Sequence, residues 1–201
     1  MVGETTKPER TPLLPLRHQQ GDFFVCDIFD AAPKGDMASM AHPIFTLSTK
    51  PDTKKRRYEA PDGESYVEIR PNMIGLATMH DRDVLIYCIS QVMAALKDGK
   101  QVHRTLRFKA FDLLVATNRP TAGTGYAGLK SALERLQGTQ IETNITTGGV
   151  EQIDGFSLID RYRIVRETRD GRMLDLEITL SDWVYRSVIS KNVLTLHRDY
   201  F

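Results

Sequence analysis

KAFDLLVATNRPTAGTGYAGLKSALERLQ, residues 109–137, is the stretch that decides the fold. Its first nine residues predict a short amphipathic helix, which a turn interrupts because Pro120 disfavours helical geometry at Arg119. A second helix is predicted from about Tyr126 to Gln137, where apolar residues recur at spacings of three, four and three. These residues form one apolar stripe: Tyr126, Leu129, Leu133 and Leu136. Two short helices joined by a proline-containing turn therefore form the centre of the chain.

The glycines at the start of the second helix have the G-x-G-x-x-G spacing of a nucleotide-phosphate loop: Gly123, Gly125 and Gly128. Glu142, nineteen residues after Gly123, imitates the acidic residue that binds a ribose. In that motif the first glycine directly follows a buried parallel strand inside a βαβ unit. Here five residues separate the apolar run LLVAT from Gly123, and antiparallel strand patterns follow. We therefore expect no dinucleotide and no other cofactor.

The opposite side of the second helix carries small or polar residues: Thr124, Ala127, Gly128, Ser131 and Arg135. A helix that enters the major groove of DNA needs such a face, because bulky side chains hold its backbone away from base edges and phosphates. On this interpretation the glycines ease a tight turn and a close approach to the groove. A plain surface helix with its apolar side in the core explains this helix, taken alone, equally well.

The order of the other predicted elements gives the two helices a context. A long helix is predicted over His80–Lys100, where Asp81 can cap the start and Gly99 ends the helix. The strand RTLRF (104–108) follows it, and after the two short helices come the strand patterns TQIETNI (139–145), FSLIDRYRIVRE (156–167) and RMLDLEITL (172–180). Ser181 then caps a last helix. This order predicts an α+β fold, a winged helix-turn-helix with the helix-turn-helix at about 105–137 and the wing at about 156–180.

Sequence before the long helix predicts two further segments. A flexible arm without its own core is expected at 1–20, so the winged-helix domain spans 21–201. An N-terminal β extension is expected at about 44–70, with the runs IFTLST (44–49), KKRRYEA (54–60) and SYVEIRP (65–71). Pro61-Asp62-Gly63 joins the last two runs in a turn. The basic cluster Lys54–Arg57 either contacts nucleic acid or discourages aggregation at a sheet edge.

The strand register of the wing can be predicted from its loop. A three-residue loop of Arg169, Asp170 and Gly171, with Gly171 left-handed in a bulge, keeps apolar residues on one face. The cross-strand pairs are then Ile164 with Leu176, Tyr162 with Ile178, and Arg163 with Glu177.

Composition limits the classes of function. With 201 residues, 41% hydrophobic and 26% charged, the chain is expected to be a soluble globular protein. Without an apolar run near the roughly 20 residues of a membrane span, or a signal peptide, we expect a cytoplasmic protein that does not bind a membrane. Cys26 and Cys88 lie far apart in apolar contexts, which favours buried thiols in a reducing compartment. The five histidines lack ligand spacing, so no metal is expected.

Charge is unevenly distributed along the chain. The net charge is only +1, but seven basic and two acidic residues give the segment Lys100–Gln140 a local charge of +5. Phosphate contact requires such a region, although the charge taken alone favours a solvated surface. Asp81 and Asp83 beside His80 suit a helix start, where the macrodipole stabilises acids. The sequence has no paired nucleophile and base, and we expect no enzymatic activity.

Three long strings add a resemblance: RFKAFDLLVATNRPTAGTGYAGLKSALERLQGTQIETNI (107–145), FFVCDIFDAAPKGDMASMAHPIFTLSTKPD (23–52) and VEIRPNMIGLATMHDRDVLIYCISQ (67–91). The chain resembles the plasmid replication initiator protein A family of bacteria over about Phe23–Phe201. The resemblance implies binding to origin repeats in double-stranded DNA, origin opening and recruitment of host replication proteins. It also implies a homodimer formed through the first winged-helix domain. A second such domain follows in these initiators, whereas this sequence stops at LHRDYF (196–201), so it looks like the first domain, isolated or naturally short.

The residues expected to contact DNA lie in four groups. Lys109 is assigned to phosphate. The turn and helix start supply Arg119, Thr121, Thr124 and Tyr126, and the second helix supplies Gly128, Lys130, Ser131 and Arg135. The wing supplies Arg161, Arg163, Arg169 and Arg172. Tyr126 also belongs to the apolar stripe, which favours core packing, and acidic residues interleave with the wing arginines, so cross-strand pairing competes with DNA binding there.

Two other functions stay open. A winged-helix transcriptional repressor reads DNA with the same fold. A protein-interaction or dimerisation module without its own sequence-specific DNA binding is favoured by the modest net charge, the missing second domain and an apolar β surface around Ile164 and Leu176.

Overall fold

The structure is a computed structural model that describes residues 24–25, 33–36, 43–48, 50–61, 63, 65–144, 153–166, 173–191, 193–197 and 200. The predicted arm 1–20 lies outside the described residues, as do Arg169, Arg172 and the bulged loop with Gly171. Within the described residues no helix is long and apolar enough to cross a membrane.

Helix α2 (Met79–Lys97) is the centre of the core, with residues buried on most sides. Thr78 is its N-cap, and Asp81 three residues later completes a capping box, so the prediction that Asp81 itself caps the helix is wrong by one turn. Gly99 has a φ of 70° and donates its N–H to the Leu96 carbonyl. The predicted stop at Gly99 is therefore confirmed.

The main sheet has the strand order β1 (Phe24–Val25), β5 (Thr105–Lys109), β9 (Met173–Leu180), β8 (Ile159–Arg166). β1 runs parallel to β5, and the other pairs are antiparallel. The register of β8 and β9 matches the prediction, with Tyr162 opposite Ile178 and Ile164 opposite Leu176. Alternation of buried and exposed residues turns one face toward the helices, where Phe108 meets Tyr87 of α2 edge to face at 5.1 Å between ring centroids.

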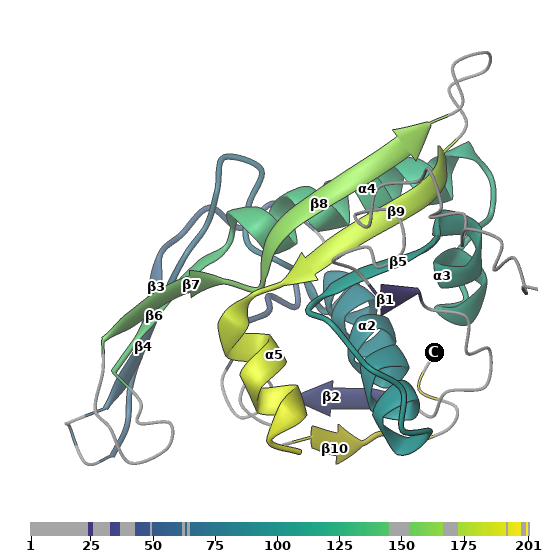
Figure 1. The fold of residues 1–201 in the computed structure, drawn as a ribbon. Coiled ribbons are helices and arrows are strands. Elements are labelled where there is room, and N and C mark those ends of the chain that lie inside the picture. Colours follow the sequence, from purple (N-terminus) through teal and green to yellow (C-terminus); the bar gives the residue numbers. More distant parts are fainter. Residues whose placement is uncertain are drawn as a thin grey trace, which may run out of the picture.

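Helices α3 (Ala110–Ala116) and α4 (Gly123–Gly138) follow β5 and lie on the helical side of this sheet, as Figure 1 shows. α3 ends because Asn118 adopts a φ of 52°, which lets Arg119 donate its N–H to the Leu114 carbonyl at 2.8 Å. α4 begins three residues before the predicted Tyr126. The apolar stripe is confirmed: its three leucines are fully buried and Tyr126 is half-buried against the core.

A second, antiparallel sheet projects from the body of the molecule and is seen at the left of Figure 1. Its order is β3 (Arg56–Glu59), β4 (Tyr66–Arg70), β6 (Gln140–Thr143), β7 (Asp154–Ser157). The strand predicted over 156–167 is in fact divided at buried Leu158 between β7 here and β8 of the main sheet. The strand predicted over 44–49 is reduced to a single bridge, Thr46 with Thr78, because that segment packs against the start of α2.

The remaining elements lie beside α2. β2 (Lys34–Asp36) and β10 (Val193–Thr195) form a two-stranded antiparallel sheet. α5 (Asp182–Ile189) begins after Ser181, whose hydroxyl accepts the Val184 N–H at 3.4 Å as its predicted capping role requires. Trp183 of α5 stacks on Phe156 of β7 with ring centroids 4.5 Å apart, which joins the projecting sheet to the body.

Candidate nucleic-acid interface

The outward face of α4 has the small side chains that the sequence predicts. Thr124, Ala127 and Gly128 are exposed and Ser131 is half-buried. A Cβ placed on Gly128 has no atom within 4 Å, so the space in front of it is open. The first two turns of α4 can therefore be approached closely by another surface.

Gly125 has a different role from Gly128. It is buried, and a Cβ on it would lie 1.7 Å from the Pro120 carbonyl oxygen. The prediction that the glycines ease a close approach to the groove is therefore wrong for Gly125, whereas their predicted role in a tight turn fits it. Its missing side chain instead allows the turn after α3 to fold back on the start of α4.

Arg135 was predicted on the exposed face, and the structure corrects this. Its guanidinium Nε and Nη2 donate to the two carboxylate oxygens of Asp81, at 2.6 and 2.7 Å. The side chains of Arg135 and Asp81 are 22% and 2% exposed. The hydrogen bond to Asp81 is the main reason that the pKa of Arg135 is raised. Arg135 thus points from α4 toward the first turn of α2.

Arg119 is also engaged within the protein rather than free at the turn. Its guanidinium donates to the His80 carbonyl and lies 3.5 Å from an Asp83 carboxylate oxygen, with the Arg119 side chain 16% exposed. Burial raises the pKa of Asp83, and the Arg119 charge opposes that shift. The expectation that Arg119 and Arg135 approach a duplex together with Lys130 is therefore not supported by their positions.

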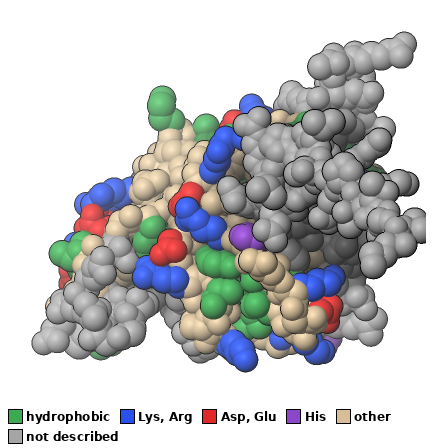
Figure 2. All heavy atoms as spheres, in the orientation of Figure 1, with side chains coloured by type: hydrophobic (Ala, Val, Ile, Leu, Met, Phe, Trp, Pro, Cys, Tyr) green, Lys and Arg blue, Asp and Glu red, His purple; other side chains and the backbone are tan. Residues whose placement is uncertain are grey.

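Other predicted residues remain accessible. Thr121, Lys109 and Lys130 are exposed, and Lys130 pairs with Glu134 one turn along α4 at 3.2 Å. Of the wing residues that the structure describes, Arg161 and Arg163 are exposed, and Arg163 lies 3.4 Å from Glu177 on the neighbouring strand. Figure 2 shows basic and acidic side chains next to one another on the face of the molecule that includes β8. The cross-strand pairing that the sequence predicts is therefore present at Arg163.

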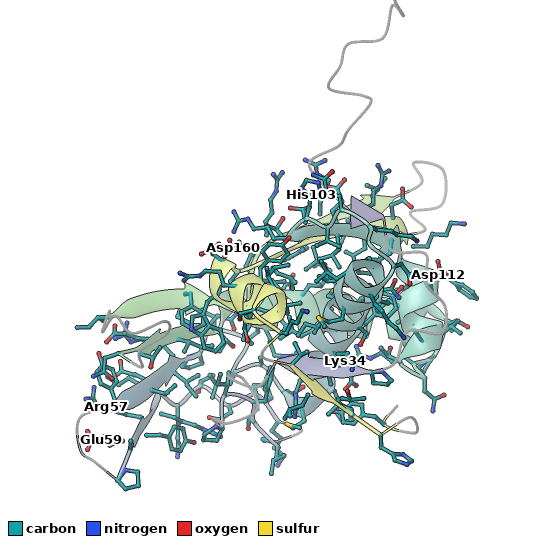
Figure 3. The ribbon with its side chains drawn as sticks, turned by 60° about the horizontal axis from the view of Figure 1, so that its bottom comes forward. Lys34, Arg57, Glu59, His103, Asp112 and Asp160 are labelled. Carbon is teal, nitrogen blue, oxygen red and sulfur yellow. The ribbon has the colours of Figure 1, made fainter. Side chains whose placement is uncertain are left out.

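Lys55 and Arg57 of the basic cluster Lys54–Arg57, which runs into the start of β3, form ion pairs on the projecting sheet. Glu68 is 3% exposed and contacts Lys55 at 2.9 Å, Arg57 at 3.7 Å and Arg70 at 2.6 Å. Hydrogen bonds from Lys55 and then Arg70 lower the pKa of Glu68. In Figure 3 Arg57 and Glu59 lie on this sheet, at the opposite side of the view from Asp112 of α3. The cluster therefore lies at the projecting sheet and not at α3 and α4.

The nucleotide-loop hypothesis finds no support in this geometry. Gly123 follows α3 and a turn rather than a buried strand. The Glu142 carboxylate accepts hydrogen bonds from the Tyr66 hydroxyl at 3.0 Å and from Arg70 at 2.9 Å. In the part of the chain that the structure describes, no group of three or more His, Cys, Asp or Glu residues is placed to hold a metal ion.

Sequence reasoning missed two groups that hold α4. Asp81 was read as a cap alone, because its partner Arg135 is 54 residues away and no local pattern links them. Asn72 donates from its side-chain amide to the Glu134 carbonyl of α4 at 3.0 Å. Asn118 carried a usable signal, since Asn is enriched among residues with positive φ.

Both the sequence and the fold of this chain resemble those of known proteins. The sequence profile described as replication initiator protein A matches residues 34–201. A curated protein of Wigglesworthia glossinidia brevipalpis, described as "Putative replication protein", is 33% identical over 197 residues, which is 96% of this chain and 70% of that protein. Two crystal structures of domains 2 and 3 of RctB superpose with TM-scores of 0.55 and 0.52 at 12% identity. The likeness covers 74% of this chain but only 60% and 57% of those chains, and it concerns the fold alone.

Proposed function

Because the chain belongs to the replication initiator protein A family, we propose that it binds double-stranded DNA with α4 in the major groove. The observation that carries this proposal is the face of α4. Its inner residues are fully buried, while Thr124, Ala127 and Gly128 leave the outer backbone accessible within its first two turns. A groove-binding helix needs both properties, since it must be fixed to its domain and approach base edges closely.

The arrangement around α4 supports the winged-helix interpretation. In chain order α2, β5, α3 and α4 precede the paired strands β8 and β9, and β9 lies between β5 and β8 in the sheet. β6 and β7 are inserted between α4 and this hairpin and belong to the projecting sheet. On this proposal α3 and α4 are the helix-turn-helix, and β8 and β9 form the wing.

Phosphate contact in this proposal rests on the accessible basic residues. Lys109 at the start of α3 and Lys130 on α4 are exposed, as are Arg161 and Arg163 of β8. Thr124 and Ser131, seven residues apart, supply hydroxyl groups to the same side of α4, and Thr121 supplies a third from the exposed turn before it. We propose further that the DNA is a plasmid origin with short repeats, that the protein acts as a homodimer, and that host replication proteins join the complex, as suits an initiator of this family.

The proposal is tested by selecting duplexes from a random-sequence DNA library with the purified chain. Affinity for the selected duplex and for a scrambled duplex of equal length is then measured over a series of salt concentrations. We expect tighter binding to the selected duplex and a linear fall of log affinity with log salt. Absence of salt-dependent binding to either duplex overturns the proposal, and footprinting on the selected duplex locates the protected bases.

One observation favours a protein-interaction module as the second candidate. Phe111 and Val115, one turn apart on α3, are 47% and 55% exposed. The apolar β surface that the sequence suggested around Ile164 and Leu176 faces the core, because Leu176 is fully buried and Ile164 packs against the core, so it does not support this function. Sedimentation of the wild-type chain and of Phe111→Ser separates the candidates. The interaction module is favoured if the wild-type chain forms a protein complex that Phe111→Ser loses, and if the wild-type chain does not bind DNA.

A further inference from the structure

The carboxylate of Asp81 joins the start of the core helix to α4. Two parallel hydrogen bonds from Arg135 at 2.6 and 2.7 Å fix both the separation of the groups and their rotation. Asp81 is 2% exposed at its side chain, so the pair is shielded from water on the acidic side. Ion pairs of this kind are costly to break, because the remaining charge stays buried without its partner.

Asp81 is itself held in one orientation. Its Oδ2 accepts the Thr78 N–H at 2.8 Å, and its own N–H donates to the Thr78 hydroxyl at 3.3 Å. The capping box therefore fixes the carboxylate that Arg135 binds. An acid on a freely rotating side chain would tolerate movement of α4, whereas this acid transmits the position of α2.

The same segment holds α4 at several other points. Arg119, in the turn that leads into α4, binds the His80 carbonyl and Asp83, both in the first five residues of α2. Asn72 donates to the Glu134 carbonyl at 3.0 Å, and the Thr139 hydroxyl accepts the Ala77 N–H at 2.9 Å. The C-terminal half of α4 and the chain before the helix are thus fixed to residues 72–83.

We propose that Asp81 is a positioning residue for DNA recognition, and that Arg135 is the anchor through which it acts rather than a phosphate contact. This inference rests on the proposed function of α4. Thr124 lies eleven residues before Arg135, which is about 16 Å along a helix. A tilt of about 10° at the anchor moves Thr124 by about 3 Å, the length of a hydrogen bond. Short side chains such as Thr and Ser cannot reach across that gap, so the small face reads bases only while the anchor holds.

The two roles of Arg135 predict opposite results for Asp81→Asn. If Arg135 is an anchor, the variant lowers affinity for the selected duplex and leaves affinity for a scrambled duplex nearly unchanged. If Arg135 is a phosphate contact restrained by Asp81, the variant releases it, so binding to both duplexes strengthens. Arg135→Met, which keeps part of the aliphatic stem, lowers the salt slope by about 0.9 only in the second case.

The experiment measures both duplexes with Asp81→Asn, Arg135→Met, the double variant and Arg135→Lys, each at a temperature at which it is folded. We expect the ratio of selected to scrambled affinity to fall about tenfold or more in Asp81→Asn and in Arg135→Met, with an unchanged salt slope. The double variant is expected to be no worse than the singles, since both remove one interaction. Arg135→Lys keeps the charge, provides a second variant if another does not fold, and is expected to restore part of the ratio.

A control comes from α5, where Asp182 pairs with Arg186 at 3.0 Å on the surface. Asp182→Asn removes an exposed Asp–Arg ion pair within one helix and makes the same substitution away from α4, and we expect an unchanged ratio. Unchanged ratios in the Asp81 and Arg135 variants overturn this inference but leave the proposed function of α4 in place. Stronger binding by Asp81→Asn has the same consequence. A wild-type chain that binds neither duplex overturns the proposed function and this inference with it.

Discussion

Gly125 lies so close to Pro120 that a Cβ on the glycine would be 1.7 Å from the proline carbonyl oxygen. The obstacle is backbone, which a rotamer change cannot remove. Gly125→Ala is therefore expected to lower the free energy of unfolding by about 3 kcal/mol, the upper part of the range for overpacked sites. Chemical denaturation measures the change, and Gly128→Ala is the control. With open space in front of Gly128, that variant is expected to gain about 0.5–1 kcal/mol from helix propensity.

Gly128 also separates stability from recognition. Gly128→Gln places a long side chain on the outer face of α4, where no atom obstructs it. We expect the variant to unfold at or above the wild-type denaturant concentration, yet to bind the selected duplex at least about tenfold more weakly, because the side chain holds the helix away from the bases. Normal affinity in a folded variant would show that this face of α4 does not meet DNA.

Leu133 tests the buried side of the same helix. It is 0% exposed and belongs to the core cluster. Leu133→Ala is expected to cost about 2–5 kcal/mol of unfolding free energy, since it removes buried methyl groups and leaves a cavity. Thermal and chemical unfolding both report this loss, and unchanged stability in both would contradict the packing of the stripe.

Lys109 and Lys130 test whether the accessible basic residues contact phosphate. Each Lys→Ala change is expected to weaken binding to selected and scrambled duplexes alike and to lower the salt slope by about 0.9. Stability should change by less than about 0.5 kcal/mol, because both side chains are exposed. A double variant with the wild-type slope would identify these charges as a solvated surface.

Glu68 makes the projecting sheet sensitive to acid. Its pKa is lowered by hydrogen bonds from Lys55 and Arg70, so the folded state favours the ionised form. The stabilisation is fully present above the ordinary Glu pKa of about 4.3 and is lost as the pH falls through the lower folded pKa. Glu68→Gln is thus expected to be less stable than wild type at pH 7, with the difference shrinking toward pH 3. Denaturant midpoints across this range measure it, and a constant difference would exclude an ionic origin.

Local patterns in the sequence predicted much of the fold because they act over a few residues. The apolar stripe of α4, the stop at Gly99 and the hydroxyl cap of Ser181 all follow from helical periodicity or end chemistry. The β8–β9 register follows from the requirement that one face of a hairpin be apolar. The small outer face of α4 was predicted in the same way over its first two turns.

Sequence by itself therefore determined the helices, the hairpin register and the small face of α4. Only the tertiary structure decided which side chains are engaged inside the protein and which remain accessible to a ligand. Asp81 and Arg135 are 54 positions apart, and their pairing depends on how α2 and α4 pack. The same holds for Arg119, for the contact of Gly125 with Pro120, and for the division of one predicted strand at Leu158 between two sheets. Helical spacing predicts the face of the helix on which a side chain lies. It does not predict which residues of other segments contact that face, because contacts between distant segments form only when the whole chain packs.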